Sequence, residues 1–400
     1  MQIYKLGEVF KTTSGGTPSR RNPNYYNGNI PWIKSGELES NVILTSEEKI
    51  TEEAIKNSSA KIFPKGTLLI ALYGATIGKL ATLGIDAATN QAVCGIFENG
   101  EHSIKYLYWY LFHKRRKLIE AGIGGAQPNI SQTILKNLEV PLPSKKNQQN
   151  IVSKIEELFS ELDKGVEELK KTQQQLKIYR QAVLKWAFEG KLTNKNVKEG
   201  ELPIGWMWKK ISEICNVVRG GSPRPAGDLR YYDGNIPFLK VADLTKDDGI
   251  YLSRFKYTIK EAGLHKTRKI DPNTLLLSNS GATLGVPKIC IINATMNDGI
   301  AAFLNSDKRS NLYIYYFWLS KTRELRNINM GAAQPNLNTD IIKNYKLPFC
   351  SFEEQQEVVK EIENRLSVCD KIVETIINSL QQSEALRQSI LKKAFEGKLV

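Results

Sequence analysis

The sequence predicts an α+β fold with an internal pseudo-two-fold repeat, in which two similar mixed α/β domains are separated by two long antiparallel helices that form a coiled coil. Three observations predict it. Short motifs recur at a nearly constant offset, two stretches carry apolar residues at a 3.5-residue period, and both stretches close on the letters AFEGKL. The chain of 400 residues is therefore two diverged copies of one unit, each a globular segment followed by a long helix.

The two long helices are predicted from their apolar seams. At 1.5 Å per residue each reaches roughly 60 Å, and a lone helix of that length would expose its stripe to water, so each is predicted to bury its seam against the other. Gly190 and Gly397 are placed as helix-ending residues. The predicted seam positions are Val152, Ile155, Phe159, Leu162, Val166, Leu169, Gln173, Leu176, Arg180, Val183 and Ala187 in the first helix, and Val359, Ile362, Leu366, Cys369, Val373, Ile376, Leu380, Ser383, Arg387, Ile390 and Ala394 in the second.

The repeat offset is 207 residues, the difference between 394 and 187 at equivalent alanines. It recurs, within a residue or two, along the whole chain. GGTPSR (15–20) matches GGSPRP (220–225), YYNGNIPWIK (25–34) matches YYDGNIPFLK (231–240), GATIG (74–78) matches GATLG (281–285), and AQPN occurs at 126–129 and 333–336.

The repeat divides the chain into five segments. The stretch between the copies is polar and carries Pro203 and Gly205, which is typical of a hinge. The predicted segments are a first domain (1–144), a first long helix (145–193), a linker (194–207), a second domain (208–351) and a second long helix (352–400).

Within the domains, glycine, proline and asparagine clusters predict short strands joined by exposed loops. Residues 67–72 and 274–277 read as equivalent buried strands, and 90–97 as a further strand. Ser103 is predicted to cap a helix through about Lys117. Trp32, Ile33, Phe238 and Leu239 are predicted to lie in the core.

The net charge of +14 favours a polyanion as partner, most simply nucleic acid. Residues 145–193 hold 10 basic and 7 acidic side chains and residues 351–400 hold 7 and 9, so the helices together sum to +1 and the remaining +13 belongs to the rest of the chain. No apolar run is long enough to cross a bilayer and the N-terminus lacks a signal pattern, so a cytoplasmic location is expected.

The sequence patterns argue against an enzyme. Residues 74–79 are one residue short of a phosphate-binding loop, and Val286 stands where the first copy has Lys79, so a tight turn beside a strand is expected. Residues 22–25 (NPNY) lack the second proline of the adenine-methyltransferase stretch. The five cysteines are scattered and the three histidines do not space like metal ligands, so no catalytic residue and no metal site is predicted.

One loop in each copy is rich in side chains that suit DNA. Arginine can pair with a phosphate or a guanine and asparagine or glutamine with an adenine, although a solvated loop whose tyrosines pack on the domain would look the same. The asparagine and glutamine side chains that the two AQPN loops share either read bases or fix a proline turn. The predicted DNA-binding residues are Arg20, Arg21, Asn24, Tyr25, Tyr26, Lys34, Gln127 and Asn129 in the first copy, and Arg219, Arg224, Arg230, Tyr231, Lys240, Gln334 and Asn336 in the second.

These motifs occur in the same order in both copies. Through the whole set the chain resembles the specificity (S) subunit of type I restriction-modification systems over essentially its full length. The resemblance rests on GNIPWIK and GNIPFLK, GATIG and GATLG, the AQPN loops, the Gln-Gln pairs at 148–149 and 355–356, and the AFEGKL endings. It implies that each globular segment is a target recognition domain for double-stranded DNA and that the subunit has no catalysis and no cofactor of its own. It further implies two methylation (M) subunits as partners, with S-adenosylmethionine bound on them, and restriction (R) subunits in the full complex.

Two helices of fixed length would then act as a ruler between two half-sites, and because the domains have diverged the target should be bipartite and asymmetric. Apolar residues left outside the seams either dock M subunits or widen the helix core; they are Leu158, Tyr179, Trp186 and Leu386. Two rival readings are a self-contained methyltransferase or nuclease, and a coiled-coil adaptor without DNA contact.

Overall fold

The computed structural model describes residues 2–39, 42–121, 129–194, 196–281, 283–328 and 337–400. The chain forms two compact units. Unit 1 comprises Met1–Leu169 and Ile377–Val400, and unit 2 comprises Lys170–Ile376. Both long helices, α5 (Lys145–Phe188) and α9 (Phe352–Phe395), contribute residues to each unit.

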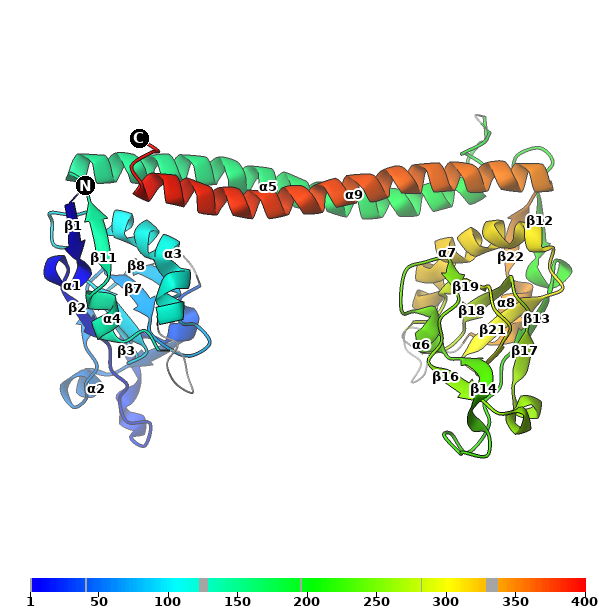
Figure 1. Cartoon of the computed structure of the whole chain (residues 1–400), viewed down its shortest axis with the longest axis horizontal. Helices are drawn as coiled ribbons and strands as arrows, with labels where there is room; N and C mark the ends of the chain where they lie inside the picture. Colours follow the sequence, from blue (N-terminus) through cyan, green and yellow to red (C-terminus); the bar gives the residue numbers. More distant parts are fainter. Residues whose placement is uncertain (1, 40–41, 122–128, 195, 282, 329–336) are drawn as a thin grey trace. The chain divides into compact units, whose positions relative to one another are not determined.

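The two units repeat one sheet topology, which confirms the predicted mixed α/β duplication (Figure 1). Each has a two-stranded, a five-stranded and a four-stranded sheet. In unit 1 these are β1 (Gln2–Lys5) with β11 (Glu139–Leu142); β2 (Thr12–Ser14), β10 (Val93–Ile96), β7 (Leu68–Ala71), β8 (Leu80–Leu83) and β4 (Val42–Ile43); and β5 (Glu48–Ile50), β3 (Tyr26–Ile33), β9 (Ala87–Thr89) and β6 (Ile62–Phe63). In unit 2 they are β12 (Met207–Lys210) with β22 (Lys346–Phe349); β13 (Asn216–Arg219), β21 (Ile300–Leu304), β18 (Thr274–Ser278), β19 (Pro287–Cys290) and β15 (Tyr251–Leu252); and β16 (Tyr257–Ile259), β14 (Tyr232–Leu239), β20 (Ala294–Met296) and β17 (Arg268–Ile270).

Helices complete each unit. The principal ones are α3 (Ile104–Ala121) and α7 (Asn311–Ile328), which occupy equivalent places. Ser103 caps α3 as predicted, since its Oγ accepts a hydrogen bond from the Tyr106 backbone N–H at 3.3 Å. The short helices are α1 (Leu6–Val9), α2 (Glu52–Lys56), α4 (Gln132–Lys136), α6 (Val241–Leu244) and α8 (Thr339–Asn344), with 3-10 turns η1 (Pro23–Tyr25), η2 (Ser35–Glu37), η3 (Ile211–Glu213), η4 (Glu261–Lys266) and η5 (Lys308–Ser310).

The long helices run antiparallel in each unit, as the seams predict. In unit 1, Ile155 and Phe159 of α5 share a core with Ile390 and Ala394 near the end of α9. In unit 2 the roles are exchanged, because the end of α5, including Ala187, packs with the start of α9. All 22 predicted seam positions, every one of them within the described chain, are buried or half-buried.

The two seam arginines form ion pairs that the sequence did not predict. Arg387 pairs with Asp163 in unit 1, and Arg180 pairs with Asp370 in unit 2. The arginines differ by 207 in number, and so do the aspartates. The same arginine–aspartate contact is thus made once in each unit, with the roles of α5 and α9 exchanged. This is the pattern expected of an isologous pairing.

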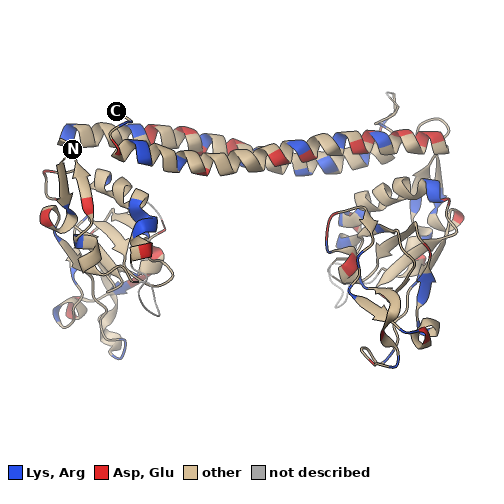
Figure 2. Cartoon of the chain, in the orientation of Figure 1, with Lys and Arg blue, Asp and Glu red and all other residues tan. Residues whose placement is uncertain are grey.

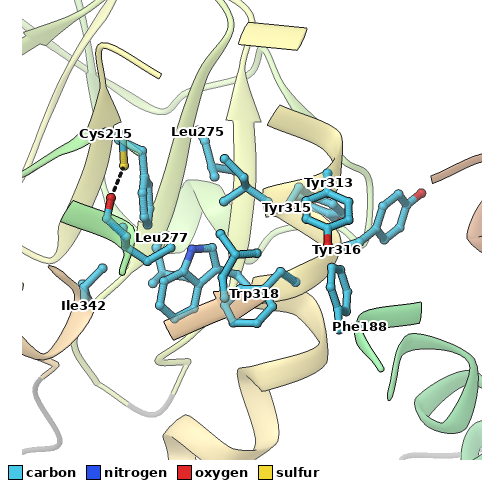
Figure 3. Close-up of a cluster of buried hydrophobic side chains, with 14 of the residues drawn as sticks. Phe188, Cys215, Leu275, Leu277, Tyr313, Tyr315, Tyr316, Trp318 and Ile342 are labelled. Carbon is cyan, nitrogen blue, oxygen red and sulfur yellow. Dashed lines mark hydrogen bonds between the residues drawn. The ribbon is translucent and has the colours of Figure 1, made fainter. Parts of the chain in front are cut away.

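The repeated AFEGKL ending locks each long helix onto a domain. Phe188 lies edge-on to Tyr313, with the ring centroids 5.2 Å apart (Figure 3). It also lies edge-on to Phe317, with the centroids 5.3 Å apart. Phe395 lies in the same way against two tyrosines of α3. Gly190 then ends α5 at φ +73°, where the Lys191 N–H reaches the Trp186 carbonyl at 2.9 Å.

The cores otherwise follow the predicted pattern. Trp32, Ile33, Phe238 and Leu239 are all buried, as predicted. Trp206 is buried although the sequence analysis placed it between the two domains. Trp206, in the segment interpreted as a linker, is only 7% exposed and packs in the core of unit 2.

Candidate DNA interface

The predicted DNA-binding loops lie at the end of each domain that faces away from the helices, where β3 meets β5 and β14 meets β16 (Figure 1). The same bulge interrupts both ladders: Tyr26 and Ile30 both register with Ile50, and Tyr232 and Ile236 both register with Ile259. A bulge bends a strand and re-aims its side chains. The repeated YYxGNIP motif is therefore a bulged strand that carries the candidate site.

Glycine is required in this bulge by a close approach of two backbones. A Cβ on Gly28 would lie 2.3 Å from the Ile50 carbonyl oxygen, and one on Gly234 would lie 2.4 Å from that of Ile259. The preceding residue is left-handed in both units, with φ of 60° at Asn27.

The second tyrosine of the motif fixes the loop in each unit. The Tyr26 hydroxyl donates to the Pro18 carbonyl at 2.6 Å, and the Tyr232 hydroxyl donates to the Pro223 carbonyl at 2.8 Å. Tyr26 also lies edge-on to Trp32. Its role in DNA binding stays a prediction, while its role in holding the arginine-rich loop against the sheet is evident from these contacts.

Arg20 of unit 1 lies in a cluster that binds it from several sides. Its guanidinium donates to both Glu48 carboxylate oxygens, at 2.6 and 3.1 Å, and lies over the rings of Tyr26 (4.4 Å) and Trp32 (5.1 Å). The hydrogen bonds to Glu48 raise the pKa of Arg20, and those from Arg20 lower the pKa of Glu48. Lys34 joins the cluster through Glu48 at 3.1 Å and Glu47 at 2.7 Å.

The remaining unit 1 candidates divide between free and packed side chains. Arg21 and Asn24 are exposed, and Asn24 is held through its backbone N–H by the Asn22 side chain at 3.1 Å. Tyr25 is half-buried and packs on the core beside Trp32. Arg21 and Asn24 therefore keep side chains available to a ligand.

Unit 2 arranges its cations differently. The Arg230 guanidinium pairs with Asp228 at 2.6 Å, and this interaction lowers the pKa of Asp228 to about 2. Arg219 donates to the Asp298 carbonyl oxygen at 2.5 Å, and Arg224 lies 3.8 Å from the Asp298 carboxylate. Arg224 and Arg230 thus lie beside carboxylates, and Arg219 is held by a backbone carbonyl.

Aromatic rings hold two lysines of unit 2. The Lys240 ammonium lies 3.5 Å from the centroid of Tyr257, and Lys266 lies 4.4 Å from that of Tyr231, whose other neighbour is Arg230 at 5.5 Å. The residues that sequence reasoning missed are the acidic and aromatic partners, which come from other strands and loops. They are Glu47, Glu48, Asp298 and Tyr257; the cation Lys266, which lies on the ring of Tyr231, was missed as well.

The AQPN prediction is only partly covered by the described residues. Gln127, Gln334 and Asn336 lie outside them. Asn129 is exposed and forms an antiparallel bridge with Tyr73. The backbone at this place is equivalent in both units, because the Ile130 N–H donates to Leu72 and the Leu337 N–H donates to Asn279, both at 2.7 Å.

The four predicted partner residues lie on or near the helix surface. Tyr179 and Trp186 are each 36% exposed and lie edge-on to one another, and Leu386, at the position equivalent to Tyr179, is 48% exposed. Leu158 is half-buried against the core of unit 1. Figure 2 shows acidic and basic residues interspersed along both helices, so the exposed apolar residues stand among charged ones.

Each unit also has a hollow at the same place, where the end of a long helix meets the domain. In unit 1 it measures about 360 Å³ and is lined by Lys114, Lys392, Phe395 and Glu396 among others. In unit 2 it measures about 970 Å³. The residues equivalent to those four, each 207 positions away, also line it; they are Lys321, Lys185, Phe188 and Glu189.

The motifs weighed as catalytic have structural explanations. Gly74 and Gly78 have positive φ in a turn whose Gly78 N–H returns to the Ala71 carbonyl at the end of β7, the tight turn that was expected. Gln148, from one of the Gln-Gln pairs on which the family resemblance rests, is buried at the start of α5, where its side-chain oxygen accepts a hydrogen bond from the Ser103 N–H at 2.8 Å. Among the described residues, no cluster of His, Cys, Asp or Glu side chains could hold a metal ion. No helix in the described part of the chain is both long enough and apolar enough to cross a membrane.

Comparison with known proteins agrees with this architecture. The chain is 28% identical over 418 aligned positions to the specificity subunit of type I restriction enzyme MjaIX from Methanocaldococcus jannaschii, covering 99% of this chain and 93% of the relative. It is 29% identical over 336 positions to the EcoBI specificity subunit of Escherichia coli, covering 78% and 69%.

Solved structures share the fold. The HsdS subunit from Thermoanaerobacter tengcongensis aligns with a TM-score of 0.66 at 19% identity, over 99% of this chain and 97% of that one. A chain from a structure of the complex assembly of a type I R-M system aligns with a TM-score of 0.74, also at 19% identity, over 99% and 98%. A family model described as the type I restriction modification DNA specificity domain matches residues 1–172 and again 203–382, so the chain belongs to this family.

Proposed function

We propose that this chain is the DNA-specificity subunit of a type I restriction-modification complex, that it has no catalysis of its own, and that each unit reads one half of a bipartite, asymmetric target. The observation that carries the proposal is the repeat itself. The two units share one sheet order and one bulged loop strand, yet that strand and its neighbours present different charged and aromatic side chains. A common scaffold with different reading groups fits two different half-sites.

Double-stranded DNA is the favoured ligand because of the chemistry gathered on these loops. Arginines held by carboxylates, exposed asparagine and lysines on aromatic rings are groups that contact phosphates and base edges. Outside the helices the chain carries a net +13, which supports association with a polyanion and argues against an adaptor that does not contact DNA.

The methyl-transfer and cleavage activities are assigned to partners. Two methylation subunits, which bind S-adenosylmethionine, would dock on the chain, one for each unit, and restriction subunits would join them. Support for one partner per unit comes from features that occur twice, namely the hollow beside Phe395 and Phe188 and the exposed positions Tyr179 and Leu386. The cleavage step is assigned to the R subunits, so we expect no catalytic site for cleavage on this chain.

The test reconstitutes the chain with its methylation subunits and treats a random DNA library with the complex. Sequencing the methylated adenines should give one motif with two defined halves and an unread gap. Replacing residues 1–144 with the first domain of another specificity subunit should change one half and leave the other. A contiguous motif, or a change in both halves, contradicts the proposal.

Two controls separate the rival functions. The chain alone should transfer no methyl group from labelled S-adenosylmethionine to DNA, and transfer by a preparation free of methylation subunits would favour an enzyme. The complex should bind DNA with an affinity that falls steeply with salt. Absence of salt-dependent binding by the complex would favour a structural adaptor.

A further inference from the structure

One strand position differs in kind between the two otherwise similar loops. In the β3–β5 ladder the residue opposite Trp32 is Glu48, and in the β14–β16 ladder the residue opposite Phe238 is Tyr257. Directly opposed residues of an antiparallel pair share a face of the sheet, so both side chains project beside the same aromatic core residue. The strand pairing and the neighbouring aromatic core residue are equivalent in both units, while this position has changed from a carboxylate to a phenol.

In unit 1 this carboxylate fixes an arginine. Glu48 accepts a two-pronged hydrogen bond from Arg20, whose guanidinium also lies on Tyr26 and Trp32. A forked arginine–carboxylate pair sets the direction of the guanidinium as well as its distance. Glu48 uses two of the five N–H donors of Arg20, and the Arg20 side chain is 55% exposed, so the other donors are accessible from solvent.

Together with Glu47, the same carboxylate also removes the net charge of the cluster. Arg20 and Lys34 contribute two positive charges, and Glu47 and Glu48 contribute two negative ones. A neutral cluster releases few counterions from DNA, so it adds little to sequence-independent binding of phosphates. What it retains is a fixed guanidinium beside a carboxylate, groups that can hydrogen-bond guanine and cytosine or adenine edges respectively.

In unit 2 the equivalent cation is not neutralised. Lys240, equivalent to Lys34, lies on the ring of Tyr257, and no ion pair of its ammonium is found among the described residues. The motif arginine is displaced to Arg224, whose partner is Asp298 rather than a residue of β16. Unit 2 therefore offers a lysine that is held by an aromatic ring and keeps its net charge, where unit 1 offers an arginine bound to a carboxylate.

Resting on the proposed function, we infer that Glu48 is a positioning residue for base readout by unit 1: it aims Arg20 at a base edge and prevents the Arg20–Lys34 pair from acting as a simple phosphate contact. Tyr257 occupies this place in unit 2 and holds Lys240 without neutralising its charge, so the Glu48/Tyr257 position helps make the two half-sites differ.

The experiment uses the complete methylation complex on the random library, with the half read by unit 1 identified by the swap of residues 1–144. Glu48→Gln should reduce discrimination about tenfold at one or two base positions of that half, the worth of a good base contact, and leave the other half unchanged. Because Arg20 and Lys34 are freed, the slope of log affinity against log salt should steepen by about 1.

Two further variants separate positioning from charge and from folding. Glu47→Gln removes the same charge beside Lys34 without touching Arg20, so it should steepen the salt slope and keep the base preference. Arg20→Lys keeps the charge but lacks the fork, so it should relax the same positions as Glu48→Gln, and the double variant should lose no more than either single one.

The possible outcomes are distinct. If Glu48→Gln keeps wild-type discrimination, or lowers methylation of all sequences equally together with the melting temperature, the inference is overturned and Glu48 is structural. If Glu47→Gln relaxes the same bases, charge and not the position of Arg20 explains the effect, which also overturns it. A wild-type complex that gives no two-part motif overturns the proposed function itself.

Discussion

The paired seam arginines offer a direct test of the antiparallel helices. The double variant Arg387→Asp with Asp163→Arg exchanges the charges of one pair and keeps the net charge. Each single variant, in contrast, places two like charges together. Arg387 is 20% exposed and its guanidinium also lies 4.9 Å from the ring centroid of Phe159, whereas Asp163 is 66% exposed. The arginine change should therefore be the more costly one.

The magnitudes follow from these exposures. A partly exposed ion pair contributes about 0.5–1 kcal/mol, a cation on an aromatic face about 0.5–1 kcal/mol, and two like charges about 4 Å apart near water repel by about 1 kcal/mol. Arg387→Asp should lower the free energy of unfolding by about 2–3 kcal/mol, because it loses the ion pair and the cation–π contact and gains a repulsion, and Asp163→Arg should lower it by about 1.5–2 kcal/mol. The double variant should recover about 3–4 kcal/mol of the sum, because both repulsions disappear and the reversed pair attracts again.

The assay is urea unfolding of the full chain at low salt, followed by circular dichroism and by tryptophan fluorescence. Trp109 lies 5.1 Å from Phe159 and reports on this part of unit 1. The recovery should shrink at 1 M salt, where surface charges are screened. The matched control combines Asp163→Arg with Arg180→Asp, which has the same charge balance but joins residues that are not partners, so its losses should simply add.

The reasoning is refuted if the double exchange of Arg387 and Asp163 is no more stable than the sum of its single variants, or if the control pair recovers equally. Either result would mean that α5 and α9 do not meet in this register.

Three further predictions concern the scaffold. Gly28→Ala should destabilise unit 1 by about 1–3 kcal/mol in chemical denaturation, because its Cβ would strike the neighbouring backbone, whereas Gly36→Ala, with open space around it, should change little. Phe395→Ala should lower the free energy of unfolding by about 3–5 kcal/mol in the same measurement, because it removes the ring that anchors α9 between two tyrosines. An equal loss of stability in Leu386→Ala, at an exposed position, would contradict this. Native thiols should react slowly with iodoacetamide at pH 8 and quickly in urea, and fast labelling without urea would be inconsistent with burial that raises the pKa of Cys94, Cys215 and Cys350 to about 12.

Much of the scaffold could be predicted because its signals are local. The 3.5-residue seam identified which face of each long helix is buried, and Gly190 marked where α5 ends, because both depend on residues within a few turns. The aromatic core positions Trp32 and Phe238 were predicted for the same reason. Trp206 was missed, since its burial depends on α7, about a hundred residues away.

The candidate site was predicted only in part. Crowded arginines and tyrosines identified the loops, but not what each side chain contacts. Arg20 meets Glu48 across 28 positions and Arg219 meets Asp298 across 79. Those pairs depend on strand register, and the bulge at Tyr26 shifts that register by an amount that no local pattern reports.

The sequence by itself determined the duplication, the two seams and the loops that carry the cationic and aromatic residues, because repeats and periodicity are properties of the linear chain. Only the tertiary structure decided which carboxylate or ring holds each cation, and hence that equivalent lysines, Lys34 and Lys240, meet Glu48 in one unit and Tyr257 in the other. The physical reason is that a side chain's electrostatic environment is set by strands brought together through folding, and distance in space, not distance along the chain, governs those interactions.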